Sequence, residues 1–193
     1  TGCEVSRVRK AGAGFSVETA QGAYACDRLI VACGGLAGSK LGGTMDGYKI
    51  LRNLGHRCTK LRPTLVQLKS SWGGVVSLKG VRANCHARIL RDGAVFAEST
   101  GELQFTEYGL SGPVIFEISR DVCQGRGQWT CRLDFLPEFT EELLRDYMRQ
   151  RIRTSGYKTA VNFLTGLFAK KLSEVLCDRC KFSKKLIAEN FTE

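Results

Sequence analysis

Hydrophobic and polar positions alternate in a strand-like way over residues 4–32 and again over residues 57–136. The first stretch ends in the apolar run 29–32, and a run without polar positions favours burial on both faces in the middle of a sheet. In the second stretch, Asp92-Gly93 separates two strand-like segments and is typical of a two-residue hairpin turn. The segments expected to be strands there are 64–68, 81–90, 94–98, 102–105 and 129–135.

Helical periodicity begins after Pro137. Thr140 is expected to cap a helix whose first turn holds Glu141 and Glu142, at the end of a helix where negative charge is favourable. Further helices are expected over residues 159–168 and 171–180, and another is expected to begin within 182–191. Their apolar stripes are interpreted as packing faces rather than as a partner's binding site.

Two shorter helices are expected within the strand-like part. One covers residues 47–54, with Asp46 as a plausible N-cap and Gly55 in the C′ position after its end. The other opens near residues 111–113, with Ser111 as its N-cap candidate.

Together these elements predict an α+β fold: a small antiparallel β-barrel followed by a helical bundle, and preceded by a few strands of an incomplete domain. The predicted boundaries are 1–60 for the first strands and connecting helix, 61–136 for the barrel-like part and 137–193 for the bundle. A hairpin and one buried strand cannot form a sheet core alone. Residues 1–60 are therefore expected either to pack on the barrel-like part or to belong to a longer polypeptide.

Composition narrows the classes of protein. The chain has 193 residues, of which 43% are apolar and 25% charged, as in soluble globular proteins. Apolar runs stay short of the roughly 18–20 residues of a membrane span, and the first residues do not resemble a signal segment. Nine cysteines, an odd number in a chain of this size, favour reduced thiols and a cytoplasmic location over a disulfide framework.

Cys177 and Cys180 stand in C-x-x-C spacing, which is compatible with a redox pair or with half of a metal site. The sequence has no second pair of this kind, and its two histidines, His56 and His86, lie far upstream. Because the segment has helical character, the favoured interpretation is two thiols that are neighbours one turn apart. No metal site is predicted.

Positive charge is concentrated in one stretch of the chain. The formal net charge is +10, and residues 47–91 contain basic residues and no acidic one. Such a stretch suits nucleic acid, an acidic partner or cofactor phosphates. The basic residues are dispersed among strand-like positions, however, so a solvated basic face is favoured over a nucleic-acid site. They are Lys49, Arg52, Arg57, Lys60, Arg62, Lys69, Lys79, Arg82, Arg88 and Arg91.

Glycine-rich segments supply the candidate chemistry. The apolar run 29–32 leads into Cys33-Gly34-Gly35, and glycines at the carboxyl end of a buried strand let a cofactor approach the backbone, although ordinary turns share this pattern. Residues 42–47 lead into a helix whose N-terminus could hold an anion, but Asp46 would occupy that cap itself. Neither the G-x-x-x-x-G-K-[ST] nor the G-x-G-x-x-G phosphate motif is found.

Residues 101–113 form the other unusual segment, a strand followed by a glycine turn and a helix start. Ser111 has no histidine and carboxylate placed to support it, which argues against a hydrolase triad. A tight structural turn and a loop that lines a ligand site both stay open as interpretations.

In this order, the motifs resemble the BaiN-like family of FAD/NAD(P)-dependent oxidoreductases. These are bacterial flavoproteins with an inserted domain made of a β-barrel and a helical bundle. The resemblance covers residues 1 to about 136, and the helical remainder is similar in character. It is carried by residues 27–35 (DRLIVACGG), 41–48 (LGGTMDGY), 54–56 (LGH), 61–68 (LRPTLVQL), 78–81 (LKGV) and 101–113 (GELQFTEYGLSGP).

The resemblance implies a cofactor side and a substrate side. Cys33 stands where the family commonly has threonine, and Glu107 where many relatives have histidine, so no catalytic residue is carried over. The family's N-terminal βαβ unit with its G-x-G-x-x-G, and its C-terminal glycine-rich segment, are both missing from this sequence. The implied FAD contacts are Ala32, Cys33, Gly34, Gly35, Gly42, Gly43 and Thr44, and the implied substrate-side loop contains Thr106, Gly109, Ser111 and Gly112.

The sequence therefore predicts the inserted domain of a flavin-dependent oxidoreductase. In the full-length enzyme it would cover FAD and shape the pocket of a small-molecule substrate, with NAD(P) as the candidate second cofactor and the remainder of its own chain as its partner. Without the pyrophosphate motif, the 193 residues alone are expected to be inactive and to bind FAD weakly or not at all. The alternative is a basic nucleic-acid-binding module built on residues 47–91.

Overall fold

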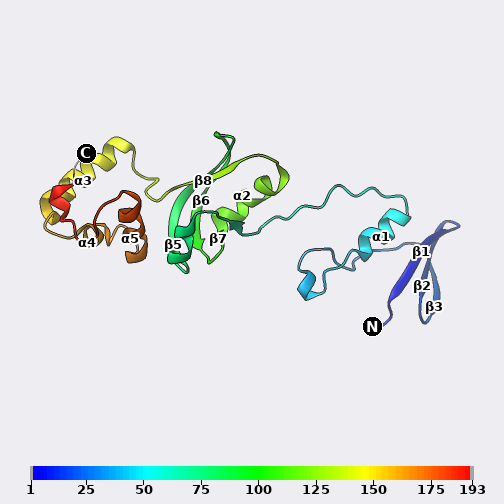
Figure 1. The fold of residues 1–193 in the computed structure, drawn as a ribbon. Coiled ribbons are helices and arrows are strands. Elements are labelled where there is room, and N and C mark those ends of the chain that lie inside the picture. The colour runs from blue at the N-terminus through cyan, green and yellow to red at the C-terminus, as the bar shows by residue number, and fades with distance from the viewer. Residues whose placement is uncertain (1, 192–193) are drawn as a thin grey trace. The chain divides into compact units, whose positions relative to one another are not determined.

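The computed structural model describes residues 2–191, which form two compact units, Thr1–Leu61 and Arg62–Glu193. Each unit contains one sheet, and the strand pairs in both sheets are antiparallel. The sheet of the second unit forms half of a barrel, and helices accompany it (Figure 1). The α+β class predicted from the sequence is confirmed.

The first unit is a three-stranded meander with one α-helix. Val8 and Val17 lie opposite each other on neighbouring strands, and Val8 is buried. The helix α1 packs against β1, so the meander has one covered position and an otherwise accessible surface. The elements are β1 (Val5–Ala11), β2 (Gly14–Thr19), β3 (Gly22–Cys26), η1 (Ser39–Leu41) and α1 (Asp46–Asn53).

The predicted buried strand over residues 29–32 is wrong. β3 ends at Cys26, and Ile30 is 89% exposed. A strand needs a hydrogen-bonding neighbour, and the first unit offers this run none, because β3 pairs only with β2. No neighbouring strand of the first unit therefore pairs with this apolar run, although its composition favours a buried strand.

The predicted C-terminal end of α1 is correct, but the predicted N-cap is not. Met45, and not Asp46, is the N-cap, and Asp46 is the first helical residue. At the C-terminal end, Gly55 has a φ of 93°, and the amide of His56 donates to the carbonyl of Leu51 at 3.0 Å. This left-handed closure is the one that a C′ glycine provides, so the predicted role of Gly55 is confirmed.

The second unit begins with the sheet β4-β7-β6-β5-β8. Asp92 and Gly93 both have positive φ, 51° and 88°, as the two central residues of a type I′ hairpin require, so the predicted turn between β5 and β6 is confirmed. The elements are β4 (Leu68–Lys69), η2 (Gly73–Leu78), β5 (Arg82–Arg91), β6 (Ala94–Phe105), β7 (Gly109–Ser111), α2 (Pro113–Gln124) and β8 (Trp129–Asp134).

Three predictions for this sheet are corrected. The segments 94–98 and 102–105 belong to one long strand, because β6 pairs with β5 along its length. The expected strand 64–68 is reduced to β4, since β7 is short and offers β4 only two pairing positions. Ser111 ends β7 and is buried, and Gly112 is the N-cap of α2 in its place, with Pro113 in the first turn.

The core of the second unit lies on one face of the sheet. Alternate residues of β5 and of the C-terminal end of β6 are buried there, whereas the intervening residues of β5 are half-buried or exposed as far as Leu90, which is buried as well. Helices α2 and α5 supply apolar side chains to the same cluster. Its buried members are Leu78, Val81, Cys85, Ala87, Ile89, Leu103, Phe105, Leu110, Val114, Ile115, Ile118, Leu172 and Val175.

The helical part is less regular than its periodicity suggests. The helix predicted over 159–168 is α4, which ends at Leu164, and Gly166 follows with a φ of 103° that α-helix geometry does not accept. Within 182–191 only a single 3₁₀ turn forms. The elements are α3 (Glu141–Ser155), α4 (Ala160–Leu164), α5 (Lys170–Arg179) and η3 (Ala188–Asn190).

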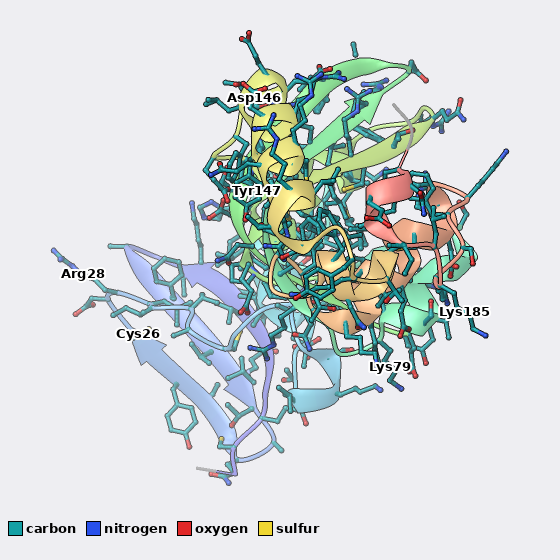
Figure 2. All side chains as sticks on the ribbon, turned by 90° about the vertical axis from the view of Figure 1, so that its left-hand side faces the viewer. Cys26, Arg28, Lys79, Asp146, Tyr147 and Lys185 are labelled. Carbon is teal, nitrogen blue, oxygen red and sulfur yellow. The ribbon has the colours of Figure 1, made fainter. Side chains whose placement is uncertain are left out.

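One arginine of α3 binds the end of α4. The Arg151 guanidinium donates to the carbonyl of Phe163 through Nη2 at 2.8 Å and through Nε at 3.1 Å. The stripe predicted as a packing face of α3 has no fully buried residue, although Tyr147 contacts the ring of Phe139. Tyr147 and Asp146 are labelled on α3 in Figure 2. No helix within residues 2–191 has both the length and the apolar composition to cross a bilayer.

Removing the cap of α3 should cost a measurable part of the stability. The Thr140 hydroxyl accepts from the amide of Leu143 at 3.3 Å, so the predicted cap is confirmed. Thr140→Ala should lower the free energy of unfolding by about 1 kcal/mol. Urea denaturation followed by circular dichroism measures this loss. Thr154→Ala, on the same helix and away from the cap, is the control, and an equal loss in the two variants would contradict the capping role.

Candidate functional site

The glycine loop of the first unit brings most of its predicted cofactor residues together. A Cβ on Gly43 would lie 2.2 Å from the carbonyl oxygen of Ala37 and 2.9 Å from that of Gly35. A Cβ on Gly47 would lie 2.8 Å from Sγ of Cys33. The backbone around residues 33–35 thus folds directly against residues 43–47, at a separation that only glycine permits.

Open backbone remains beside this contact. Nothing lies within 4 Å of a Cβ on Gly34 or Gly42, and Ala32 and Cys33 are exposed. A flat ring system could therefore approach the loop closely. The loop fits contact with the uncharged part of a dinucleotide cofactor.

The start of α1 does not fit a phosphate. The Asp46 carboxylate accepts from Lys49 at 2.8 Å, and the backbone amide of Asp46 donates to the Thr44 hydroxyl at 3.2 Å. The hydrogen bond from Lys49, followed by a side-chain hydrogen bond between Thr44 and the carboxylate, lowers the pKa of Asp46, so this carboxylate stays ionised at the helix N-terminus. A negative charge there opposes a second anion, and the pyrophosphate of FAD would need another site.

The predicted substrate-side loop of the second unit is a tight turn. The amide of Thr106 donates to the carbonyl of Gly109 at 2.9 Å, and the Thr106 hydroxyl accepts from the amide of Gly109. A Cβ on Gly109 would lie 2.0 Å from the carbonyl of Leu68. Thr106, Gly109, Ser111 and Gly112 are thus adjacent, and Ser111 and Gly112 are buried.

Gly112 joins this turn to α2. Its carbonyl accepts from the amides of Ile115 and Phe116, each at 3.0 Å. Its φ of 99° and ψ of 166° lie in a region that essentially only glycine occupies. The turn is therefore held by backbone geometry and not by a side-chain network.

The tip of the turn carries an ion pair that sequence patterns did not reveal. Lys79, at the surface of the second unit in Figure 2, donates to the Glu107 carboxylate at 2.6 Å. This bond, and then the one from Tyr108, lowers the pKa of Glu107, while the same contact raises the pKa of Lys79. Glu107 is therefore an ionised, paired carboxylate and is unsuited to act as a proton acceptor near neutral pH.

The pKa of Glu107 should return towards its ordinary value of 4.5 in a Lys79→Met variant. Because pairing lowers the folded-state pKa, the pair stabilises the fold above the unfolded-state pKa, and this contribution is lost as the pH falls through the folded-state value. NMR titration of the Glu107 carboxyl measures the change. An unchanged pKa in Lys79→Met would contradict the pairing, and Lys184→Met, at a separate ion pair with Asp178, is the control.

At least half of the basic residues in the stretch 47–91 already have carboxylate partners. Those that are paired are Lys49 with Asp46, Lys79 with Glu107, Arg82 with Glu102, Arg88 with Glu98 and Arg91 with Asp92. Moreover, the stretch spans both compact units. The charge that the sequence concentrates is thus partly neutralised by acids from elsewhere in the chain.

The cysteines show no sign of a redox or metal centre in the described structure. Cys177 and Cys180 lie one turn apart at the end of α5, the first buried and the second exposed. Burial raises the pKa of the Cys85 thiol to about 11 and of the Cys131 thiol to about 12, so both stay protonated. Among residues 2–191 no group of three His, Cys, Asp or Glu side chains is placed to hold a metal ion.

A cavity of about 730 Å³ lies on the core-bearing face of the half-barrel, and no sequence pattern predicted it. The sheet contributes Ile89, Phe105 and Leu133, and α5 contributes Leu172 and Val175. These residues come from segments far apart in the sequence, and each one has the pattern of ordinary core. The segment around the substrate-side turn reaches this cavity through Leu110.

Comparison with known proteins gives matches over both units. Residues 62–193 match the family model described as HI0933-like protein barrel and H2TH domain. The chain is 37% identical over 175 residues to a 3-dehydro-bile acid delta(4,6)-reductase of Clostridium scindens, covering 89% of this chain and 43% of that protein. It is 31% identical over 118 residues to a ribosomal RNA dihydrouridine synthase of Escherichia coli, covering 60% and 29%.

A second ribosomal RNA dihydrouridine synthase, from Haemophilus influenzae, is 26% identical over 167 residues, covering 86% of this chain and 39% of that protein. The chain thus spans less than half the length of these curated relatives. The family model covers more than half of the chain and includes the whole half-barrel and helical part. The resemblance seen in the sequence is confirmed, and this chain belongs to the HI0933-like family of flavoprotein oxidoreductases, which is the BaiN-like family.

Proposed function

We propose that this chain is the part of a flavin-dependent oxidoreductase that covers FAD and shapes the substrate pocket. The observation that carries the proposal is the match of the entire second unit to the family's barrel and H2TH domain. The identity to a reductase extends over 89% of the chain and so includes the glycine loop of the first unit. The remainder of the same polypeptide is the proposed partner.

We assign contact with the flavin ring to this chain and binding of the pyrophosphate to the rest of the polypeptide. The loop containing Gly34 and Gly42 gives a flat ring access to the backbone, which supports contact with the flavin. The ionised Asp46 at the start of α1 disfavours a phosphate, so we assign the pyrophosphate grip to polypeptide outside these residues. When bound, FAD would supply hydride chemistry, and this chain would orient the substrate and exclude water.

For the substrate, we propose a small organic molecule rather than a nucleic acid. One relative is named for a bile acid and two for ribosomal RNA, so relatives alone do not decide between the classes. The ion pairs along the stretch 47–91 favour the small molecule, because a paired arginine or lysine must leave its carboxylate before it binds a phosphate. A basic RNA-binding surface is the second candidate.

The full-length protein provides the test. Loaded with FAD and kept free of oxygen, it should lose its yellow colour when NADH or NADPH is added. A full-length protein whose FAD is not reduced by either nucleotide would contradict an NAD(P)-dependent oxidoreductase. In parallel, a labelled RNA hairpin should show no salt-dependent binding, and a steep loss of tight RNA binding with added salt would favour the second candidate.

A further inference from the structure

The cavity of the half-barrel combines an apolar interior with positive charge alone. Fully buried side chains such as Leu78, Phe105 and Leu172 form part of its lining. The charged residues that line it are Lys69, Arg132 and Arg179, and none of the described lining residues is acidic. Arg132 lies between the core-facing Cys131 and Leu133 on β8, so its charged end belongs to the opposite face of the sheet. Cys131, which also lines it, is a neutral thiol because burial raises its pKa.

These three cations lack carboxylate partners in the described part of the chain, unlike the five paired residues of the basic stretch. Arg179, at the end of α5, lies over the ring of Trp72, with its guanidinium carbon 5.3 Å from the ring centroid. That contact fixes a cation beside the cavity but satisfies none of the guanidinium's hydrogen-bond donors. An oxygen anion is the natural acceptor for them.

We infer that this cavity binds an organic anion with an apolar body, its carboxylate at Arg179 and its hydrocarbon part against the sheet. A volume of about 730 Å³ is in the range of pockets that take small organic ligands. Burial of apolar ligand surface supplies affinity, and Arg179 supplies selectivity for negative charge. A nucleic acid would not use the apolar interior, and a neutral lipid would not use the cations. The site does not depend on FAD, since the lining residues belong to the second unit.

The chain carries its own reporter for this test. Its two tryptophans, Trp72 and Trp129, both line the cavity, so intrinsic fluorescence responds to a ligand there. Dodecanoate is the probe, and dodecanol, with the same chain length and no charge, is its matched partner. Both are titrated below micelle-forming concentrations into the 193-residue chain and into the full-length protein.

We expect dodecanoate to bind about tenfold more tightly than dodecanol, because charge-assisted hydrogen bonds form only with the carboxylate. Arg179→Met should remove this preference and the salt dependence of dodecanoate binding, while dodecanol binding stays the same. Arg153→Met, an exposed cation on α3 outside the cavity, should behave as the unmodified protein does. Arg179 is itself exposed, so the variant should fold, which circular dichroism verifies.

Several results would overturn the inference. Equal affinity for dodecanoate and dodecanol would show that the cavity does not select anions. An unchanged preference for dodecanoate in Arg179→Met would show that Arg179 does not bind the carboxylate. Binding to the 193-residue chain but not to the full-length protein would show that the rest of the polypeptide fills the cavity. Because dodecanoate binding is read without flavin, a colourless full-length protein would refute the proposed function and leave this result standing.

Discussion

Gly112→Ala should be one of the most damaging single substitutions in the second unit. The φ and ψ of Gly112, 99° and 166°, are accessible essentially only to glycine. A Cβ there would also lie 2.5 Å from the carbonyl oxygen of Glu102 and 3.0 Å from the amide nitrogen of Gln104. We expect the free energy of unfolding to fall by about 3 kcal/mol, from backbone strain together with displacement of β6. Urea denaturation measures the loss.

Gly93→Ala separates the two causes. Gly93 also has a left-handed φ, 88°, but nothing lies within 4 Å of a Cβ placed on it. Its substitution should cost only the strain of a positive φ, about 1 kcal/mol. Similar losses in the two variants would show that the junction of β7 with α2 tolerates a side chain and is not the rigid corner described above.

Gly43→Ala should separate flavin binding from folding in the full-length protein. A Cβ on Gly43 would collide with the carbonyls of Ala37 and Gly35, so the loop must open. The dissociation constant for FAD should rise about tenfold or more, because the backbone next to the ring would be displaced. The loop lies at the surface of the first unit, and the unfolding of the second unit should not change. Flavin fluorescence during titration of the apoprotein measures the affinity.

Gly55→Ala is the matched control for this variant. Gly55 lies beyond the C-terminus of α1, has a φ of 93° and has no atom within 4 Å of its Cβ position. Its substitution should strain the end of the helix and leave FAD affinity nearly unchanged. If Gly43→Ala binds FAD as tightly as Gly55→Ala does, the glycine loop is not a flavin contact.

Local chemistry explains which parts of the fold could be predicted from sequence. The turn at Asp92-Gly93, the Thr140 cap and the Gly55 helix end each depend on neighbouring residues alone, and all three are confirmed. The same holds for the alternation along β5, where Cys85, Ala87 and Ile89 are buried and the residues between them are not.

Features that depend on distant partners could not be predicted in the same way. The run 29–32 has the composition of a buried strand, yet whether it becomes one depends on a neighbouring strand that the first unit does not supply. β4 is short because β7 is short, which no pattern within 64–68 could reveal. The sequence likewise could not show that Glu107 pairs with Lys79 or that Arg179 lies on Trp72.

The candidate site also has parts that the sequence predicted and parts that depend on distant residues. Glycine spacing pointed to the two loops, and the structure shows why glycine is required at Gly43, Gly109 and Gly112. The charged and apolar lining of the half-barrel cavity is assembled from β4, β8 and α5, so it needed the tertiary structure. Whether Cys33 contacts FAD stays a prediction from the family resemblance.

The flavin content of two purified proteins tests the central claim most directly: that these residues cover FAD while the rest of the polypeptide grips it. The full-length protein and the 193-residue chain are each saturated with FAD, desalted and measured by visible absorbance. The full-length protein should retain stoichiometric FAD, and the 193-residue chain should retain almost none. Tight, stoichiometric FAD in the 193-residue chain, or a full-length protein that retains no flavin, would contradict the claim.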